Sequence, residues 1–251
     1  MSDRRQLVSL CDQLLQPALF KDYCPNGLQV EGRAKVSKII SGVTASQALI
    51  EAAIQAGADT LLVHHGLFWR GQEGSVTGWL KKRLALLMHH DINLLAYHLP
   101  LDAHKALGNN AQLGLFMGWE ALGQFGDQQL GWLGQPPETD QEPQAFANAL
   151  QTRLGRAPLS VIPEPDRRFK RIAWCTGAAQ SWFEAAIAAG ADAFVTGEIS
   201  EPQAHLAKET GVAFFACGHH ATERYGAPAL ATYVATELGL SHAFIDIDNP
   251  A

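Results

Sequence analysis

Apolar residues recur along the chain in short continuous runs separated by segments of helical spacing. An apolar run at 39–44 precedes an Ala-rich segment in which Leu49, Ala53 and Ala56 have the spacing of one buried helix face. Gly57 follows, where glycine commonly ends a helix, and TLLVHHG (60–66) begins the next apolar run. The pattern predicts the order strand, helix, strand.

The same order returns in the second half of the chain with nearly the same residues. EAAIQAGAD (51–59) and EAAIAAGAD (184–192) are identical at eight of nine positions, and their flanks IISGVTASQ and IAWCTGAAQ are alike in character. Such a segment is also a common ending of an Ala-rich helix, but the matching flanks favour a duplication. Each copy continues with a predicted helix and a third apolar run. We therefore predict an α/β protein of two related lobes.

The predicted organisation has a first α/β repeat at 1–120, a hairpin and linker region at 121–168, and a second α/β repeat at 169–251. Within the middle region, Ala121–Leu133 alternates apolar and polar residues around Gly126-Asp127, which is typical of a hairpin. PPETDQEP reads as a loop in which Thr139 and Glu142 suggest a capping box for the next helix. SVIPEP indicates an edge strand or a linker.

Composition restricts the class of protein. Of 251 residues 47% are apolar and 18% charged, and the net charge of −6 disfavours nucleic-acid binding through a basic stripe. The four cysteines form no CxxC pair, which fits a reducing cytoplasm better than a disulfide framework. The N-terminal segment reads as an amphipathic helix, not a signal peptide, and no apolar run is long enough to span a bilayer. We expect a cytoplasmic protein.

Histidines and carboxylates cluster where the predicted strands end. The third apolar run is followed by His98 and, four residues later, Asp102; in the second copy His219 is followed four residues later by Glu223. This spacing matches His219, not His220, to His98. The second strand of the first copy ends in His64 and His65, and strand ends are where open α/β sheets build sites.

These six residues could converge if the two lobes face each other. Imidazoles with carboxylates favour zinc, iron, manganese, cobalt or nickel over magnesium. They exceed the three protein ligands of one open catalytic zinc and suit two divalent ions that share a bridging carboxylate. Three plainer interpretations stay open: an HH pair can simply end a helix, as His89-His90 does, Asp102 can cap a helix, and Glu223 can be a first-turn acid. Glu198, which corresponds to His65 in the repeat, is a further candidate contact.

Several motifs carry a resemblance to a known family over nearly the whole chain. They are PNGLQVEG, GVTAS, VHHG, HLPLDAHKALGNNAQLG, VTGEIS and GHHATE. The chain resembles the GTP cyclohydrolase I type 2 homologues, the Ngg-interacting-factor-like proteins that form dinuclear-metal toroids. The resemblance implies two intertwined α/β repeats with mixed sheets, a dinuclear metal site between them, and a homohexameric ring.

The resemblance also implies a ligand set. His64 and Asp102 would bind one ion, His65 and His219 the other, and Glu223 would bridge them, with His98 in a neighbouring role. A centre of this kind is typical of hydrolases, so we expect a metal-dependent hydrolase of a small molecule or nucleotide in which His98 and Glu223 are catalytic. The alternatives are a non-enzymatic metal-handling or scaffold ring and a DNA-repair-associated protein, the last disfavoured by the acidic composition. No membrane partner is expected.

Overall fold

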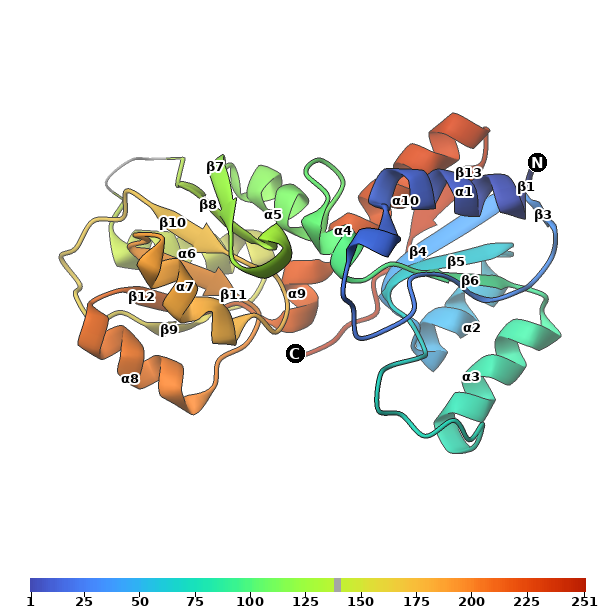
Figure 1. The fold of residues 1–251 in the computed structure, drawn as a ribbon, viewed down its shortest axis with the longest axis horizontal. Helices are drawn as coiled ribbons and strands as arrows, with labels where there is room; N and C mark the ends of the chain where they lie inside the picture. The colour runs from blue at the N-terminus through green and yellow to red at the C-terminus, as the bar shows by residue number, and fades with distance from the viewer. Residues whose placement is uncertain (138–140) are drawn as a thin grey trace. The chain divides into compact units, whose positions relative to one another are not determined.

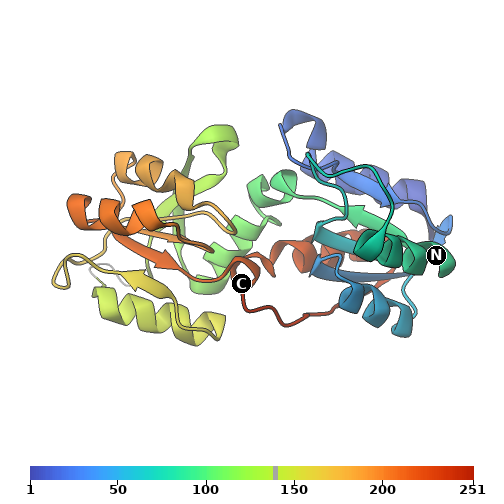
Figure 2. The same ribbon diagram turned by 90° about the horizontal axis from the view of Figure 1, so that it is seen from below.

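The computed structural model describes residues 1–137 and 141–251, so the predicted capping residue Thr139 lies outside the described residues. The chain divides into two compact units: unit 1 is Met1–Gly108 with Arg224–Asp248, and unit 2 is Asn109–Glu223 with Asn249–Ala251. Figures 1 and 2 show the elements of each. Among the described residues, no helix is long and apolar enough to cross a membrane.

Both units contain helices as well as strands. Unit 1 contains β1 (Ser2–Asp3), α1 (Arg4–Leu15), η1 (Pro17–Leu19), β2 (Gly27–Val30), β3 (Lys35–Val36), β4 (Lys38–Thr44), α2 (Gln47–Gln55), β5 (Thr60–His65), α3 (Gly78–His89), β6 (Asn93–Ala96), α4 (Leu99–Ala103), α10 (Gly226–Leu238) and β13 (Ser241–Phe244). Unit 2 contains α5 (Asn109–Met117), β7 (Glu120–Phe125), η2 (Asp127–Gln129), β8 (Gly131–Gln135), α6 (Pro143–Leu154), β9 (Leu159–Val161), β10 (Ile172–Trp174), η3 (Gln180–Trp182), α7 (Phe183–Ala188), β11 (Ala193–Thr196), α8 (Glu201–Thr210), β12 (Ala213–Ala216) and α9 (His219–Glu223).

Each unit is built on a mixed sheet with a parallel centre. In unit 1 the order is β13-β4-β5-β6-β2, in which only β2 runs antiparallel to its neighbour. In unit 2 the order is β7-β8-β10-β11-β12-β9, with β10, β11 and β12 parallel and the outer strands antiparallel. The predicted hairpin is β7 and β8, and the SVIPEP segment contributes the edge strand β9. The α/β class with two related repeats and mixed sheets is confirmed.

The C-terminal part of the chain explains why the repeats are intertwined. After α9 in unit 2, the chain returns to unit 1, where β13 pairs with β4 and α10 packs on the same sheet. The compact units therefore follow a different division from the predicted boundaries at 120 and 168. The predicted boundaries mark where each copy of the duplicated sequence begins and ends, and they remain a prediction.

Unit 1 has a core on both faces of its sheet, because strand side chains alternate. Ile40, Leu61 and Leu94 pack with α2 and α3, while their neighbours Ile39, Leu62 and Leu95 pack with α1 and α10. Figure 1 shows these two helix pairs on opposite faces of the sheet. A parallel strand covered on both faces reads as a continuous apolar run, which is the pattern seen in the sequence.

Unit 2 follows the same rule with aromatic residues. The adjacent Phe214 and Phe215 of β12 point to opposite faces, one against Phe183 of α7 and the other against Phe146 of α6, at ring-centroid distances of 4.9 and 5.3 Å. Figure 2 shows α6 (yellow-green) and α7 (orange) on opposite sides of the sheet. Both sheets thus hold their strand ends in fixed positions, which places the side chains described below.

The N-terminal segment is the expected amphipathic helix. Asp3 caps α1 by accepting from the Arg5 backbone N–H, and Gln6 completes a capping box by accepting from the Asp3 backbone. Leu7, Cys11 and Leu15 form its buried stripe. All four cysteines are buried, and none of them forms a disulfide among the described residues.

Candidate metal centre

The candidate donors of unit 1 follow the carboxyl ends of two neighbouring parallel strands. His64 and His65 are the last residues of β5, His98 lies just beyond β6, and Asp102 is on the short helix α4. Parallel strands end at the same edge of a sheet, so these side chains come together. One ring nitrogen from each of the three histidines lies within 4.8 Å of the others. Asp102 lies within α4 and does not cap a helix after it.

His64 is held in the state that a metal ligand requires. Its side chain is fully buried, and its Nδ1 lies 3.0 Å from the backbone carbonyl oxygen of Tyr97. A carbonyl oxygen only accepts, so Nδ1 carries the proton and Nε2 keeps its lone pair. Nε2 lies 3.5 Å from Oδ1 of Asp102, itself a buried carboxylate. A backbone carbonyl that fixes the ring of a ligand histidine is a common arrangement in metal sites.

His65 and His98 complete the unit 1 group. The His98 ring centroid is 5.0 Å from that of His64 and 5.6 Å from that of His65. The Nδ1 of His65 lies 3.1 Å from the Thr44 hydroxyl. His98 donates from Nδ1 to Asp22 at 2.7 Å, so its Nε2 is the nitrogen left to face a ligand or substrate.

Asp22 is a site residue that the sequence analysis missed. Besides holding His98, it accepts from the Leu99 backbone N–H at 2.9 Å, at the start of α4, and from Asn26. Burial acts to raise the pKa of Asp22, but the hydrogen bond and charge of His98, with the Asn26 and Tyr23 bonds, hold that pKa at about 2. Asp22 and His98 lie 76 positions apart, and the only sequence signal was the proximity of Asp22 to PNGLQVEG.

Unit 2 holds a second donor group. His219 and Glu223 lie on α9, four residues apart, with 3.0 Å between Nε2 and Oε2. The other ring nitrogen, Nδ1, donates to Glu198 at 2.7 Å. Burial acts to lower the pKa of His219, but the hydrogen bonds and charges of Glu223 and Glu198 outweigh it and raise the pKa to about 9. Glu198, the counterpart of His65, thus orients the histidine.

Two glycines leave space for this pair. A Cβ atom on Gly177 would lie 2.0 Å from the Glu223 Oε1 atom and 3.3 Å from the His219 Nε2 atom. A Cβ atom on Gly197 would lie 2.7 Å from the His219 Cα atom. The Gly177 backbone N–H also donates to Thr222, on the same helix as Glu223. The loops after β10 and β11 therefore form a close-fitting cradle around the donors of α9.

The structure corrects the register by which His219 was matched to His98. Val63 and Thr196 are equivalent in the repeat. The carbonyl oxygen of Val63 accepts from the Tyr97 backbone N–H, and that of Thr196 accepts from the Cys217 backbone N–H. Tyr97 thus corresponds to Cys217, which places His98 opposite Gly218 and His219 opposite Leu99. The shared four-residue spacing is therefore not a shared position, and the prediction is wrong by one residue.

His219 nevertheless remains the candidate donor of the HH pair. Its ring lies between two carboxylates, while the neighbouring His220 is buried and donates its backbone N–H to the carbonyl of Ala251. Among the described residues, His220 belongs to none of the groups with metal-ligand geometry.

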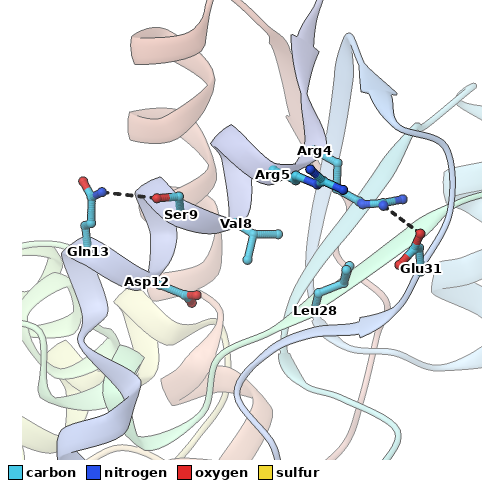
Figure 3. A pocket seen from close by; sticks show the side chains of 8 residues that line it. All are labelled: Arg4, Arg5, Val8, Ser9, Asp12, Gln13, Leu28 and Glu31. Atoms are coloured by element: carbon cyan, nitrogen blue, oxygen red, sulfur yellow. Dashed lines mark hydrogen bonds and ion pairs between the residues drawn. The ribbon is translucent and has the colours of Figure 1, made fainter.

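A separate groove of about 620 Å³ lies along α1 in unit 1 and does not contain the donor group. Its lining residues are Arg4, Arg5, Val8, Ser9, Asp12, Gln13, Leu28 and Glu31. Figure 3 shows that Arg4 pairs with Glu31 and that Gln13 bonds to Ser9, so these groups already satisfy one another. Tyr97 links the groove to the donor group. Its hydroxyl donates to Asp12, which lines the groove, and its backbone carbonyl oxygen accepts from His64.

The residues of both groups fit a transition metal better than magnesium. Imidazole nitrogens oriented by a carbonyl or carboxylate are the usual ligands of zinc, iron, manganese, cobalt and nickel, and a bound ion would take the place of the proton that His219 holds at Nε2. Buried carboxylates such as Asp102 and Glu223 are costly to keep charged unless a cation or hydrogen-bond donors face them. Clustered His, Asp and Glu side chains of this kind could hold a metal ion.

Comparison with known proteins agrees with the fold. A protein of Neisseria meningitidis serogroup A, named "GTP cyclohydrolase 1 type 2 homolog", is 52% identical over 251 residues and covers 99% of both chains. A Pseudomonas aeruginosa protein of the same name is 50% identical, covering 98% of this chain and 97% of its own. The solved structure of "protein ybgI, unknown function" has a TM-score of 0.95 at 45% identity, with full coverage of both chains.

A solved structure from Thermus thermophilus is also similar over its full length, with a TM-score of 0.90 at 34% identity. The family model described as Duf34/NIF3 (NGG1p interacting factor 3) matches residues 2–250. The chain belongs to the DUF34/NIF3 family.

Proposed function

We propose that the chain binds two divalent transition-metal ions and uses them to hydrolyse a small molecule or nucleotide. The observation that carries the proposal is His64, a fully buried imidazole whose Nδ1–H is fixed by a carbonyl and whose Nε2 faces the carboxylate of Asp102. Burying an imidazole and a carboxylate side by side is costly, and this cost supports a functional role for the pair.

The ligand set would draw on both repeats. His64 and Asp102 would hold one ion, His65 and His219 would hold the other, and Glu223 would serve both. A carboxylate has two oxygens and can bridge, whereas each histidine offers one nitrogen once its Nδ1 is hydrogen-bonded. Zinc, iron, manganese, cobalt and nickel all suit this donor set.

When bound, a pair of such ions supplies Lewis-acid polarisation of the substrate and lowers the pKa of a water molecule. The protein supplies the proton transfer. His98 exchanges its proton at Nε2, because its Nδ1 is held by Asp22 at 2.7 Å. Glu198 would hold His219 in the orientation that its ligand role requires.

One observation favours a second function, a metal carrier. His219 lies between Glu198 and Glu223, so the unit 2 donors satisfy one another without an ion. A protein that loads and releases a metal benefits from such a metal-free state. The proposal also includes a homohexameric ring in the cytoplasm, on the strength of the family resemblance.

The test is turnover by wild-type protein loaded in turn with each of the five metals, on a panel of phosphoesters, amides and cyclic C–N nucleotides. We expect at least one class to be hydrolysed, with the activity lost on chelation and in Glu223→Gln. Turnover of none of them would contradict the hydrolase. Ready exchange of the ions with a competing chelator would then favour the carrier.

A further inference from the structure

We infer that Trp69, together with Tyr23, forms a stacking platform for a planar heteroaromatic ring beside the histidines of unit 1. The inference rests on the proposed function and narrows its substrate to a compound with a nucleobase-like ring. It concerns residues of unit 1 alone and assigns Trp69 as the residue that selects the ring.

The loop after β5 brings Trp69 back to the donor group. Its ring centroid lies 5.1 Å from that of His98, with the planes at 85°, and 5.8 Å from that of His65, at 56°. Trp69 is half-buried, so part of the indole remains accessible. An indole that is in contact with two candidate site histidines and is partly exposed is placed to meet whatever binds there.

The loop is fixed by backbone hydrogen bonds. The Leu67 N–H donates to the Gln29 side chain at 2.8 Å, and the Arg70 N–H donates to the carbonyl of Tyr23 at 2.7 Å. Gly66 is needed for this anchorage, because a Cβ atom there would lie 2.2 Å from the Gln29 amide oxygen. Trp69 is therefore pre-positioned, which lowers the entropy cost of binding.

Tyr23 approaches the same histidine from a different segment. It is 58% exposed, and its ring centroid lies 6.3 Å from that of His98. The Arg70 guanidinium lies 5.9 Å from the centre of the Tyr23 ring and donates to the carbonyl of Asp22. Two accessible aromatic rings thus lie beside His98, and an exposed cation lies beside one of them, Tyr23.

This combination has a clear chemical preference. Tryptophan and tyrosine rings stack on planar heterocycles with little regard to the pattern of ring substituents, as in single-stranded nucleic-acid binding proteins. A nearby guanidinium favours an anionic substituent such as phosphate. A nucleoside monophosphate meets both requirements, whereas ribose 5-phosphate meets only the second.

The test compares the binding of four nucleoside monophosphates (GMP, AMP, CMP and UMP) with that of ribose 5-phosphate, by calorimetry on full-length metal-loaded protein. We expect at least one nucleotide to bind wild-type protein tenfold or more tightly than ribose 5-phosphate. Trp69→Ala should remove most of that difference and leave ribose 5-phosphate unaffected, while Trp69→Phe should keep much of it.

Trp79→Ala is the matched control, because Trp79 is accessible and lies near a guanidinium, that of Arg83, but on α3. It should bind like the wild type. Equal binding of nucleotides and ribose 5-phosphate, or an unchanged nucleotide affinity in folded Trp69→Ala, would overturn the platform.

Metal content separates this outcome from failure of the proposed function. If wild-type protein binds no metal, the dinuclear centre fails, and base-dependent quenching of indole fluorescence in that same protein still decides the platform. If metal binds but the base makes no difference, only the platform is overturned.

Discussion

Gly177→Ala is expected to displace Glu223 and to lower metal affinity by more than tenfold. The new Cβ would lie 2.0 Å from the Glu223 Oε1 atom, and Glu223 is buried, so its carboxylate has little room to move. Gly177 also has φ of +70°, which strains any L residue. Strain and collision together should lower the free energy of unfolding by about 2–4 kcal/mol.

Gly155→Ala separates the two causes. Gly155 has φ of +76° at the C-terminal end of α6, and nothing lies within 4 Å of the position its Cβ would take. This control should lose only about 1–2 kcal/mol from backbone strain and should keep its metal. Urea denaturation and metal titration check both variants. Full metal affinity in Gly177→Ala would show that the cradle around Glu223 is unimportant.

Asp59→Asn is expected to destabilise the protein strongly, although it only replaces one carboxylate oxygen with an amide nitrogen. Asp59 is buried, and its Oδ2 accepts from the Ser37 backbone N–H at 2.7 Å, the Ser37 hydroxyl at 2.6 Å and the Lys38 backbone N–H at 3.0 Å. Its Oδ1 pairs with Arg33 at 2.9 Å. An amide would turn its NH₂ group towards one of these donor sets, so we expect a loss of about 2–4 kcal/mol in the free energy of unfolding.

The destabilisation caused by Asp59→Asn should depend on pH in a definite direction. Burial acts to raise the pKa of Asp59, but the bonds from Ser37 and Lys38 and the charge of Arg33 outweigh it and lower that pKa. The stabilisation is therefore present above the unfolded-state pKa of about 4 and is lost as the pH falls through the lower folded-state pKa. The difference between wild type and Asp59→Asn in urea denaturation should be largest near pH 7 and should shrink below about pH 4.

Asp192→Asn provides the internal comparison. Asp192 occupies the equivalent position and accepts from the Lys170 and Arg171 backbone N–H groups, both at 2.9 Å, and from Arg167. It is more exposed than Asp59 and accepts from one donor fewer at Oδ2, so its loss should be smaller. An equal or larger loss for Asp192→Asn, or an Asp59→Asn effect independent of pH, would contradict the assignment.

These two aspartates show how much the sequence could reveal. The repeat EAAIxAGAD predicted the parallel strand–helix–strand units correctly, because short-range spacing determines which residues face the core. It showed that Asp59 and Asp192 correspond, but not what they do. Their partners lie at or just before the start of the preceding strand of each repeat, and only the parallel pairing of the strands brings them together.

The register error has a similar origin. The first copy has a longer connection between its second and third strands (66–92) than the second copy (197–212), so the offset cannot be carried across it. The spacing of four residues from histidine to acid was then the only guide. It is the same in both copies by coincidence, because the two histidines do not occupy equivalent positions. The longer connection is also the loop that carries Trp69, which no pattern of spacing could place beside His98.

The hydrogen bonds that orient the histidines were beyond sequence analysis for the same reason. Asp22 reaches His98 from a loop before β2, and the carbonyl that fixes His64 belongs to Tyr97, on the neighbouring strand's extension. Glu198 was the exception, because its equivalence to His65 in the repeat singled it out. Contacts between distant segments depend on the order of strands in the sheet, which could not be predicted from the spacing of residues in the sequence.

Elemental analysis of untagged protein, purified without chelator, tests the dinuclear centre most directly. Wild-type protein, His219→Ala and His220→Ala should be measured in parallel. We predict about two transition-metal ions per chain in the wild type and in His220→Ala, and a clear loss in His219→Ala, because the His219 ring faces Glu223 whereas His220 belongs to no donor group among the described residues. A folded wild type that stays metal-free even after reconstitution, or equal loss in both variants, would contradict the proposed centre.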